Sequence, residues 1–318
     1  MDSYRGGRID LIEEAQQLIS KDELAEAAKK LSEHLNKNFD DPKALFLMGY
    51  VFMKTDSFGM SYQCLKRSAE IFPGEAATWH NIAKLYHDVQ DEIAAEQFFL
   101  KALKVKPDFS IAMEGLSMVN VNKGEWGLAI EYSNRALAED PTLMEARVNR
   151  GMAYLALRRW LEGWRDYNAN IGKEKNRIEL MYGDAPFWTG EKGLDVVVYG
   201  EQGIGDEISF GSCIPDLIRD SKSVTIECDG RLEKVFRRSF PGCEVHGTRY
   251  KKNMEWRSQK KFDAKVPLGK LPEIYRSKDS DFTDGKYLVP NPEMALQWRT
   301  LLGSLGDKPK IGISWAGG

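Results

Sequence analysis

The sequence predicts an N-terminal solenoid of stacked helix pairs followed by a domain in which helices alternate with the strands of a parallel sheet, an α plus α/β architecture. The first observation behind this fold class is that Pro73, Pro107 and Pro141 follow one another at intervals of 34 residues. A fixed period of this length is typical of two-helix repeats. The second observation is that helical periodicity ends near residue 177, where short β-branched runs begin to alternate with helical segments.

The residues between the prolines keep the same phase in each copy. The copy that ends at Pro107 carries a regular series of large and small side chains, namely Trp79, Ile82, Ala83, Tyr86, Ala95, Phe99 and Ala102. This is the pattern of the tetratricopeptide repeat (TPR), in which small residues let two helices approach closely and large residues fill the remaining groove. One pair cannot bury its apolar face alone, so neighbouring pairs must stack. We therefore expect a repeat domain over residues 1–177 with about five repeats, whose concave face binds a protein or glycan partner.

The composition excludes several classes of protein. The 318 residues include 29% charged side chains and have a net charge of -3, which argues against a general nucleic-acid-binding protein. No apolar run approaches the roughly 20 residues of a membrane-spanning helix, and the first residues lack the apolar core of a signal peptide. The four cysteines have no C-x-x-C spacing and the four histidines no metal-binding spacing. We therefore expect reduced thiols, no metal site and a cytoplasmic location.

The second half begins with a connector over residues 178–193, which contains Pro186, Trp188 and Gly190. We expect Trp188 to pack against the last repeat. The parallel-sheet domain follows over residues 194–318. Its expected strands are residues 196–199, 224–228, 243–246, 262–266 and 310–315, and its expected helices include residues 208–217, 232–240 and 292–302.

A glycine-rich loop, Gly-Glu-Gln-Gly-Ile-Gly-Asp-Glu at residues 200–207, follows the first expected strand. Ligands of parallel sheets bind at the carboxyl ends of the strands, so a site is expected at this loop. The loop is not a dinucleotide fingerprint, because Ile208 stands where a third glycine is needed and the carboxylates of Asp206 and Glu207 would repel a pyrophosphate. Asp206 is either the N-cap of the following helix or a carboxylate that accepts a proton from a substrate hydroxyl.

Four segments together carry a resemblance to a known family. They are Trp164-x-x-Tyr167, Pro186-x-Trp188-x-Gly190, the loop at residues 200–206 and Gly-Ile-Ser-Trp-Ala-Gly at residues 312–317. The chain resembles bacterial TPR proteins that carry a glycosyltransferase domain similar to the heptosyltransferase-like family, which has the two-lobed GT-B fold. The resemblance implies that residues 194–318 form the first, Rossmann-like lobe of such an enzyme.

The resemblance also implies roles for individual residues. Asp206 matches the proposed base for the acceptor hydroxyl, and the donor would be a nucleotide sugar, with no metal or other cofactor. The substrate-binding candidates are Glu201, Gln202, Gly203, Gly205, Trp315 and Gly317. In this fold the second lobe holds most of the donor, and the sequence ends where that lobe should begin. We therefore expect a fragment of a longer sugar-transferring enzyme; the alternative is a non-catalytic TPR scaffold for protein–protein interaction.

Two further features have alternative interpretations. The basic segment at residues 249–261 contains six lysines and arginines and one acid, Glu255. It either contacts an anionic acceptor or forms a solvated loop, and we expect the solvated loop. Trp160 and Trp164 are four residues apart on an expected helix and therefore face the same side. We expect them to form an apolar junction between the repeats and the sheet domain rather than a sugar platform.

Overall fold

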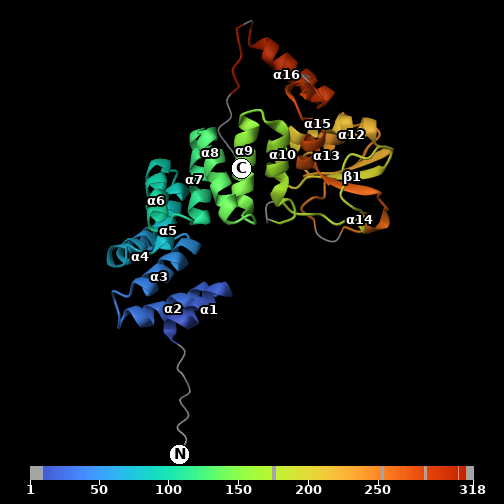
Figure 1. Cartoon of the computed structure of the whole chain (residues 1–318). Coiled ribbons are helices and arrows are strands. Elements are labelled where there is room, and N and C mark those ends of the chain that lie inside the picture. The colour runs from blue at the N-terminus through green and yellow to red at the C-terminus, as the bar shows by residue number, and fades with distance from the viewer. Residues whose placement is uncertain (1–9, 174–176, 252–253, 283–284, 307, 313–318) are drawn as a thin grey trace, which may run out of the picture. The chain divides into compact units, whose positions relative to one another are not determined.

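The computed structural model describes residues 10–173, 177–251, 254–282, 285–306 and 308–312. The chain divides into two compact units, residues 1–169 (unit 1) and residues 170–318 (unit 2) (Figure 1). The division precedes residue 177, where the sequence placed the end of the repeat domain. Asn170 and Arg177 belong to unit 2, because the Arg177 guanidinium donates to Asn170 Oδ1 at 3.2 Å and to Glu201 Oε1 at 2.9 Å.

Unit 1 consists of consecutive helix pairs (Figure 1). The pairs are α1 (Leu11–Ser20) with α2 (Leu24–Leu35), α3 (Pro42–Lys54) with α4 (Phe58–Ile71), α5 (Ala76–Asp88) with α6 (Glu92–Val105), α7 (Ser110–Lys123) with α8 (Trp126–Glu139), and α9 (Met144–Ala156) with α10 (Trp160–Tyr167). Pro73, Pro107 and Pro141 lie just beyond the ends of α4, α6 and α8. The TPR architecture that the 34-residue period predicted for this half is confirmed.

The turn inside each pair has the same backbone conformation. Its central residue has a positive φ of 62° at Asp22, 54° at Asp56, 63° at Gln90, 75° at Gly124 and 59° at Arg158. These positions are again 34 residues apart. A left-handed conformation brings Cβ close to the following carbonyl oxygen, so glycine adopts it most easily. Four of these five turns therefore tolerate a strained residue because the helices on both sides hold the turn in place.

Small residues lie where the two helices of a pair approach each other. Equivalent buried positions in successive repeats are occupied by Ala15, Gly49, Ala83, Ser117 and Gly151. A Cβ added to Gly49 would lie 2.6 Å from Leu65 Cγ, and one added to Gly151 would lie 2.4 Å from the backbone nitrogen of Tyr167. Larger side chains at these positions would force the helices apart, which is why the sequence keeps small residues in this phase.

Unit 2 contains a small parallel sheet with the strand order β3-β2-β1-β4. The strands are β1 (Asp195–Tyr199), β2 (Ser223–Glu227), β3 (Glu244–His246) and β4 (Ala264–Pro267). Val197 pairs with Thr225 of β2 on one side and with Lys265 of β4 on the other. These strands lie where the sequence predicted them. The helices of this unit are α11 (Ile204–Gly211), α12 (Ile214–Asp220), α13 (Glu233–Ser239), α14 (Trp256–Gln259), α15 (Leu271–Tyr275) and α16 (Pro292–Ser304).

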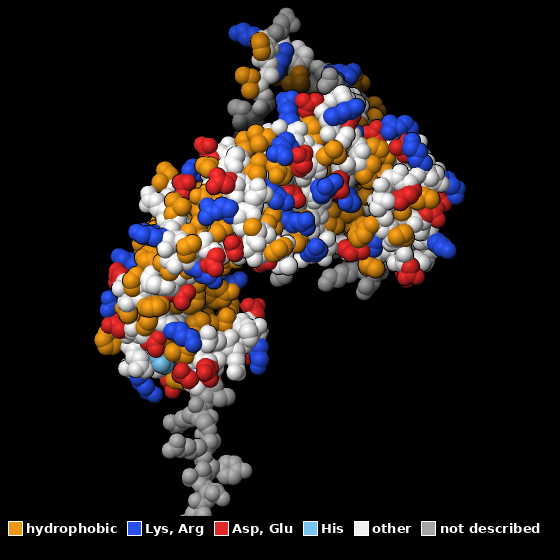
Figure 2. Space-filling view, in the orientation of Figure 1, with side chains coloured by type: hydrophobic (Ala, Val, Ile, Leu, Met, Phe, Trp, Pro, Cys, Tyr) orange, Lys and Arg blue, Asp and Glu red, His pale blue; other side chains and the backbone are white. Residues whose placement is uncertain are grey.

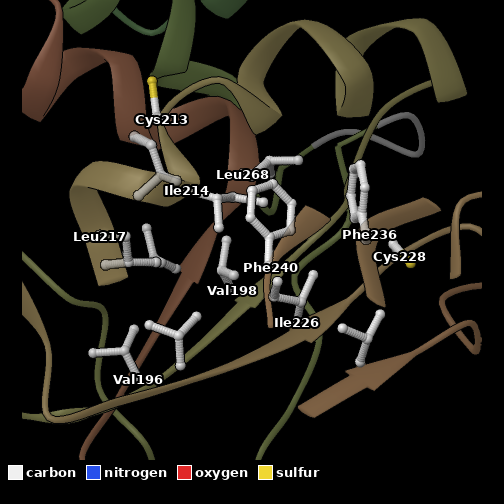
Figure 3. Packing of buried hydrophobic residues seen from close by; sticks show 14 of the residues in the cluster. Val196, Val198, Cys213, Ile214, Leu217, Ile226, Cys228, Phe236, Phe240 and Leu268 are labelled. Atoms are coloured by element: carbon white, nitrogen blue, oxygen red, sulfur yellow. The ribbon is translucent and has the colours of Figure 1, made fainter. Parts of the chain in front are cut away.

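The two faces of the sheet are covered differently. Val196 and Val198 of β1 point into a core formed with Ile214 and Leu217 of α12 and Phe236 of α13 (Figure 3). On the opposite face, Val197 and Tyr199 pack with Phe262 and with apolar side chains of residues 180–185. That second cover is mainly non-helical chain. A doubly wound domain has helices on both faces, so the described residues establish a small parallel-sheet region but not a full Rossmann-like lobe.

The structure corrects two expectations about unit 2. Trp188, which was expected to pack against the last repeat, is 1% exposed in the core of the sheet region, beside Tyr275. Its indole nitrogen donates to the carbonyl oxygen of Glu191 at 2.8 Å, so both its apolar and its polar parts are satisfied within unit 2. Residues 310–312 are not in a strand. The remainder of the strand expected at residues 310–315 lies outside the described residues.

Two further observations concern exposed or long helices. α16 has no buried residue and carries Met294, Trp298, Leu301 and Leu305 on one exposed apolar face. Within the described residues, no helix combines the length and the apolar character that crossing a membrane requires.

In unit 1, Trp160 and Trp164 stack with their ring centroids 6.3 Å apart, as their spacing predicted. The junction role proposed for them stays a prediction.

Because of the repeated turn, we expect alanine substitutions at two neighbouring glycines to differ in their effect on the free energy of unfolding. Gly124→Ala places a Cβ in a left-handed turn and should lower the free energy of unfolding by about 1 kcal/mol. Gly127→Ala is the matched control, because Gly127 has no positive φ and an added Cβ meets no atom within 4 Å. It should leave stability unchanged or raise it by up to about 1 kcal/mol. Urea unfolding followed by circular dichroism measures both; equal effects of the two variants would contradict this account of the turn.

Candidate functional site

The glycine-rich loop after β1 starts a helix. Gly203 is the N-cap of α11, and Oδ2 of Asp206 accepts a hydrogen bond from the Gly203 backbone N–H at 3.0 Å. The interpretation of Asp206 as the N-cap is therefore corrected: it is the third residue of the helix and its carboxylate bonds back to the cap residue. Asp206 is half-buried and lies beyond the carboxyl end of β1. The position suits a proton acceptor, and that role stays a prediction.

The glycines of the loop differ in how much space a side chain would have at each position. Gly203 and Gly205 are exposed and neither has a positive φ. An added Cβ would meet nothing within 4 Å at Gly205, whereas at Gly200 it would lie 2.4 Å from Cδ of Glu207. The close approach to the backbone of this loop therefore occurs at Gly200, against the Glu207 side chain of the same loop. The substrate-binding roles of Gly203 and Gly205 remain untested predictions.

Glu201 and Gln202 lie between the carboxyl ends of β1 and β4. Glu201 is 3% exposed, and its carboxylate accepts hydrogen bonds from the Arg177 guanidinium at 2.9 Å and from Gln202 Nε2 at 3.1 Å. The backbone N–H of Gly269, after β4, donates to the same carboxylate at 3.4 Å. In this strand order β2 and β3 follow on one side of β1 and β4 lies on its other side, so the strand order reverses between β1 and β4, which is where parallel sheets bind ligands. Arg177 occupies that position here, so Glu201 acts as its partner.

A second carboxylate is buried beside this loop. Glu207 is 1% exposed, forms an ion pair with Arg249 and accepts a hydrogen bond from the backbone N–H of Asp229 at 2.9 Å. Burial raises the pKa of Glu207 above its ordinary value, although Arg249 and the Asp229 N–H oppose the shift. The sequence analysis did not predict that Glu207 is buried and paired with an arginine, because a glutamate at the start of a helix is usually exposed to solvent.

A third buried carboxylate ends strand β2. Glu227 accepts hydrogen bonds from Arg257 Nε at 2.9 Å, Arg257 Nη2 at 2.5 Å, Tyr182 Oη at 2.6 Å and Thr248 Oγ1 at 2.5 Å. Burial raises the pKa of the Tyr182 hydroxyl, which therefore stays protonated and donates to Glu227. These bonds join the connector to the sheet.

The basic segment at residues 249–261 supplies two of the cations at this edge. Arg249 binds Glu207 and Arg257 binds Glu227, while Lys260 binds Glu244 at 2.7 Å. The expectation of a solvated loop is therefore wrong for Arg249 and Arg257, because buried carboxylates require them, whereas Lys260 and its partner Glu244 are both partly exposed to solvent. Together, the pairs Arg177–Glu201, Arg249–Glu207 and Arg257–Glu227 form the sheet-edge ion pairs. Trp315 and Gly317, the other substrate-binding candidates, lie outside the described residues.

Unit 1 contains an open groove. One cavity of about 570 Å³ and another of about 510 Å³ share the lining residues Gln16, Phe46, Leu47 and Ala77, so they are adjacent, and we call them together the repeat groove. Figure 2 shows hydrophobic side chains gathered in a hollow of unit 1. The lining comes mainly from the first helices of successive repeats, α1, α3 and α5, with Ile111 of α7.

The repeat groove is apolar at its floor and basic at its rim. Its apolar lining consists of Ile19, Pro42, Phe46, Leu47, Tyr50, Met53, Phe72, Ala77 and Ile111. The exposed lysines Lys43, Lys54 and Lys84 also line it. His80 adds no charge at neutral pH, because burial and nearby Lys84 lower its pKa to about 4. A few charged groups around an apolar surface are typical of a peptide-binding site.

Comparison with known proteins agrees with the class that the fold defines. A family model described as tetratricopeptide repeat matches residues 76–109, which contain α5 and α6. The N-terminal region of this chain is therefore a TPR region. The matched residues lie in unit 1.

Several individual proteins are similar to this chain. Protein FlbA of Caulobacter vibrioides is 25% identical over 270 residues, which are 80% of this chain and 45% of FlbA. The peroxisomal targeting signal receptor of Kluyveromyces lactis is 26% identical over 98 residues, 31% of this chain and 17% of the receptor. The chain thus spans less than half the length of either relative.

Solved structures are also similar to about half of this chain. A crystal structure of MamA covers 53% of this chain and 97% of its own, with a TM-score of 0.45 and 17% identity. The structure of YrrB, described as a TPR protein with an unusual peptide-binding site, covers 53% of this chain and 87% of its own, with a TM-score of 0.42 and 15% identity.

From the sheet-edge ion pairs we expect a large and pH-dependent loss of stability when one of the arginines is removed. Arg249→Met should lower the free energy of unfolding by about 3–5 kcal/mol, because Glu207 stays buried without its partner. Loss of the arginine raises the folded-state pKa of Glu207 further. The penalty is therefore full above that raised pKa and disappears as the pH falls to the ordinary glutamate value of about 4.3.

Tryptophan fluorescence during urea unfolding, measured at several pH values, tests this effect. Glu207→Gln in the Arg249→Met background should recover a large part of the lost stability at neutral pH. Losses that simply add in the double variant would show that the two side chains do not stabilise each other.

Proposed function

We propose that this chain binds a segment of a partner protein in the repeat groove and so acts as a protein-interaction scaffold. The observation that carries the proposal is the contrast between the two candidate sites. The repeat groove is an open, largely apolar space with exposed charges at its rim. The ligand-binding edge of the sheet holds the chain's own buried ion pairs.

The repeat architecture supports this proposal. Stacked repeats present an extended surface on which successive first helices each contribute side chains to one ligand. One relative, similar over 98 residues, is by its name a receptor for a targeting signal. A peptide ligand is consistent with both observations.

Filling the repeat groove should abolish peptide binding. Ala77 lines both cavities, and Ala77→Trp would occupy their shared space without removing a contact from the helix pair. Peptides selected from a random phage-displayed library against the immobilised chain are synthesised with a fluorescent label and titrated by fluorescence anisotropy. Affinity should fall at least about tenfold in Ala77→Trp, since an anchor side chain loses its cavity.

The matched control is Gln97→Trp, which adds the same side chain at an exposed position of α6 outside the groove. It should bind the selected peptides as the unaltered chain does. Failure to select any peptide, or equal binding by Ala77→Trp, would refute the proposed function.

We propose sugar transfer as a second candidate function, in a longer protein that supplies a donor lobe. The specific observation in its favour is the half-buried Asp206 carboxylate beyond the carboxyl end of the central strand β1. In this proposal Asp206 accepts the proton of an acceptor hydroxyl, and a nucleotide sugar is the donor.

Asp206→Asn tests the second candidate. Asparagine keeps an oxygen that can accept from the Gly203 N–H, so the melting temperature should change little. Transfer from a panel of nucleotide sugars by the full-length protein should fall about 100-fold or more, because the variant lacks the proton-accepting carboxylate. Unchanged transfer in Asp206→Asn would remove this residue from the mechanism.

A further inference from the structure

The repeat groove offers an apolar anchor site next to exposed apolar side chains. Phe46 and Leu47 of α3 line both of its cavities, and Phe72 and Ile111 at its margins are 52% and 37% exposed. Covering such side chains removes apolar surface from water. The occupant therefore carries at least one large apolar side chain.

The charge in the groove is strongly one-sided. Lys43, Lys54 and Lys84 line it, and the only carboxylate in the two linings, as far as the described residues show, is Glu75. Glu75 already accepts a hydrogen bond from the backbone N–H of Ala77 at the start of α5, at 3.3 Å. Three ammonium groups thus face the space opposite a single, engaged acid.

These lysines differ from others in the same unit. Lys30 pairs with Glu14 at 2.6 Å and Lys123 with Glu96 at 2.9 Å. In the described part of the chain no ion pair engages Lys43, Lys54 or Lys84. Lys54 lies over the ring of Tyr50, with its Nζ 5.5 Å from the ring centroid, which keeps the ammonium beside the groove. Lys84 also interacts with Glu114 of α7 and acts to lower the pKa of that carboxyl, so the positive potential of the groove comes mainly from Lys43 and Lys54.

The charge reverses further along the first helices of the repeats. Glu114 of α7 accepts a hydrogen bond from Asn149 of α9 at 2.9 Å, and nearby Glu145 contributes to raising its pKa, after the larger effect of burial. An acidic ligand is repelled there and attracted beside α3 and α5. The change of sign along the unit favours one register of the ligand.

We propose that the repeat groove selects an acidic peptide segment. Its large apolar side chain enters the cavity between Phe46 and Ala77, and its flanking carboxylates bind Lys54 and Lys84. This inference rests on the proposed function, and it adds the chemical class of the partner: an apolar residue flanked by glutamates or aspartates. A basic segment would place its charges against the lysines and is rejected.

Three short labelled peptides test the inference with the full chain. They share one central Leu-Phe anchor and differ in flanks of glutamate, glutamine or lysine. The glutamate peptide should bind about tenfold more tightly than the glutamine peptide, as two exposed charge pairs allow, and the lysine peptide most weakly. Its advantage should shrink between about 0.05 M and 0.5 M salt, because salt screens exposed charges.

Charge-reversal variants test which lysines cause the preference for acidic peptides. Lys54→Glu and Lys84→Glu should each weaken the glutamate peptide and strengthen the lysine peptide. Lys104→Glu is the matched control, because Lys104 is exposed on α6 outside the groove; it should leave the order of affinities unchanged. The same reversal of preference in Lys104→Glu would show a general charge effect and overturn the inference.

The remaining outcomes separate this inference from the function on which it rests. Equal binding of the glutamate and glutamine peptides, abolished in both by Ala77→Trp, would overturn acidic selection and keep peptide binding. Failure of all three peptides, together with failure of the phage selection, would overturn both. A mass that rises with concentration in sedimentation, and falls in Ala77→Trp, would identify a second copy of the chain as the occupant and overturn the acidic-peptide inference.

Discussion

Three carboxylates are buried where the strands of the sheet end, and each of them needs a cation. An ionised carboxylate without a partner is strongly destabilising in a protein interior. Glu201, Glu207 and Glu227 are therefore each held by one arginine. Arg177 directly precedes the connector, and Arg249 and Arg257 belong to the basic segment, so these pairs hold both stretches of chain at the edge of the sheet. The same pairs occupy the space in which a parallel sheet would otherwise bind a ligand.

The helices of unit 1 pack through small residues rather than through buried ion pairs, and the repeat groove of this unit stays open. Small residues at Gly49, Ala83 and their equivalents allow close helix contact in every repeat, so the backbone arrangement is nearly constant. The residues of the repeat groove are not under this constraint. They differ from one repeat to the next, with Lys43 and Lys54 on α3, Lys84 on α5 and Ile111 on α7. A regular scaffold can in this way carry an individual binding surface.

The glycine-rich loop at residues 200–207 serves the local structure in several ways. Asp206 satisfies the Gly203 N–H at the start of α11, Glu201 binds Arg177, and Gly200 leaves room for Glu207. Such structural duties are compatible with catalysis only for a group that also faces open space, and Asp206 is the half-buried member of this set. The proposed sugar transfer therefore depends on this one carboxylate.

The helix pairs could be predicted because the contacts that define them are local. The partner of each helix is the next one in the chain, so Pro73, Pro107 and Pro141 and the small residues between them reveal the repeat directly. The strands at residues 196–199 and 224–228 were predictable because runs of β-branched residues are typical of strands buried on both faces. Glycine-rich residues 200–207 likewise indicated the strand end but not the environment of each side chain.

The ion pairs could not be predicted from the sequence, because the partners are 24, 42 and 30 residues apart and a charged residue gives no sign of its own burial. Trp188 shows the same difficulty for an apolar residue: its identity predicts burial but not which core receives it. The repeat groove depends on side chains of α1, α3 and α5, which meet only once the repeats stack. Local periodicity therefore specified the elements, whereas long-range packing specified which side chains are paired and which remain open to a ligand.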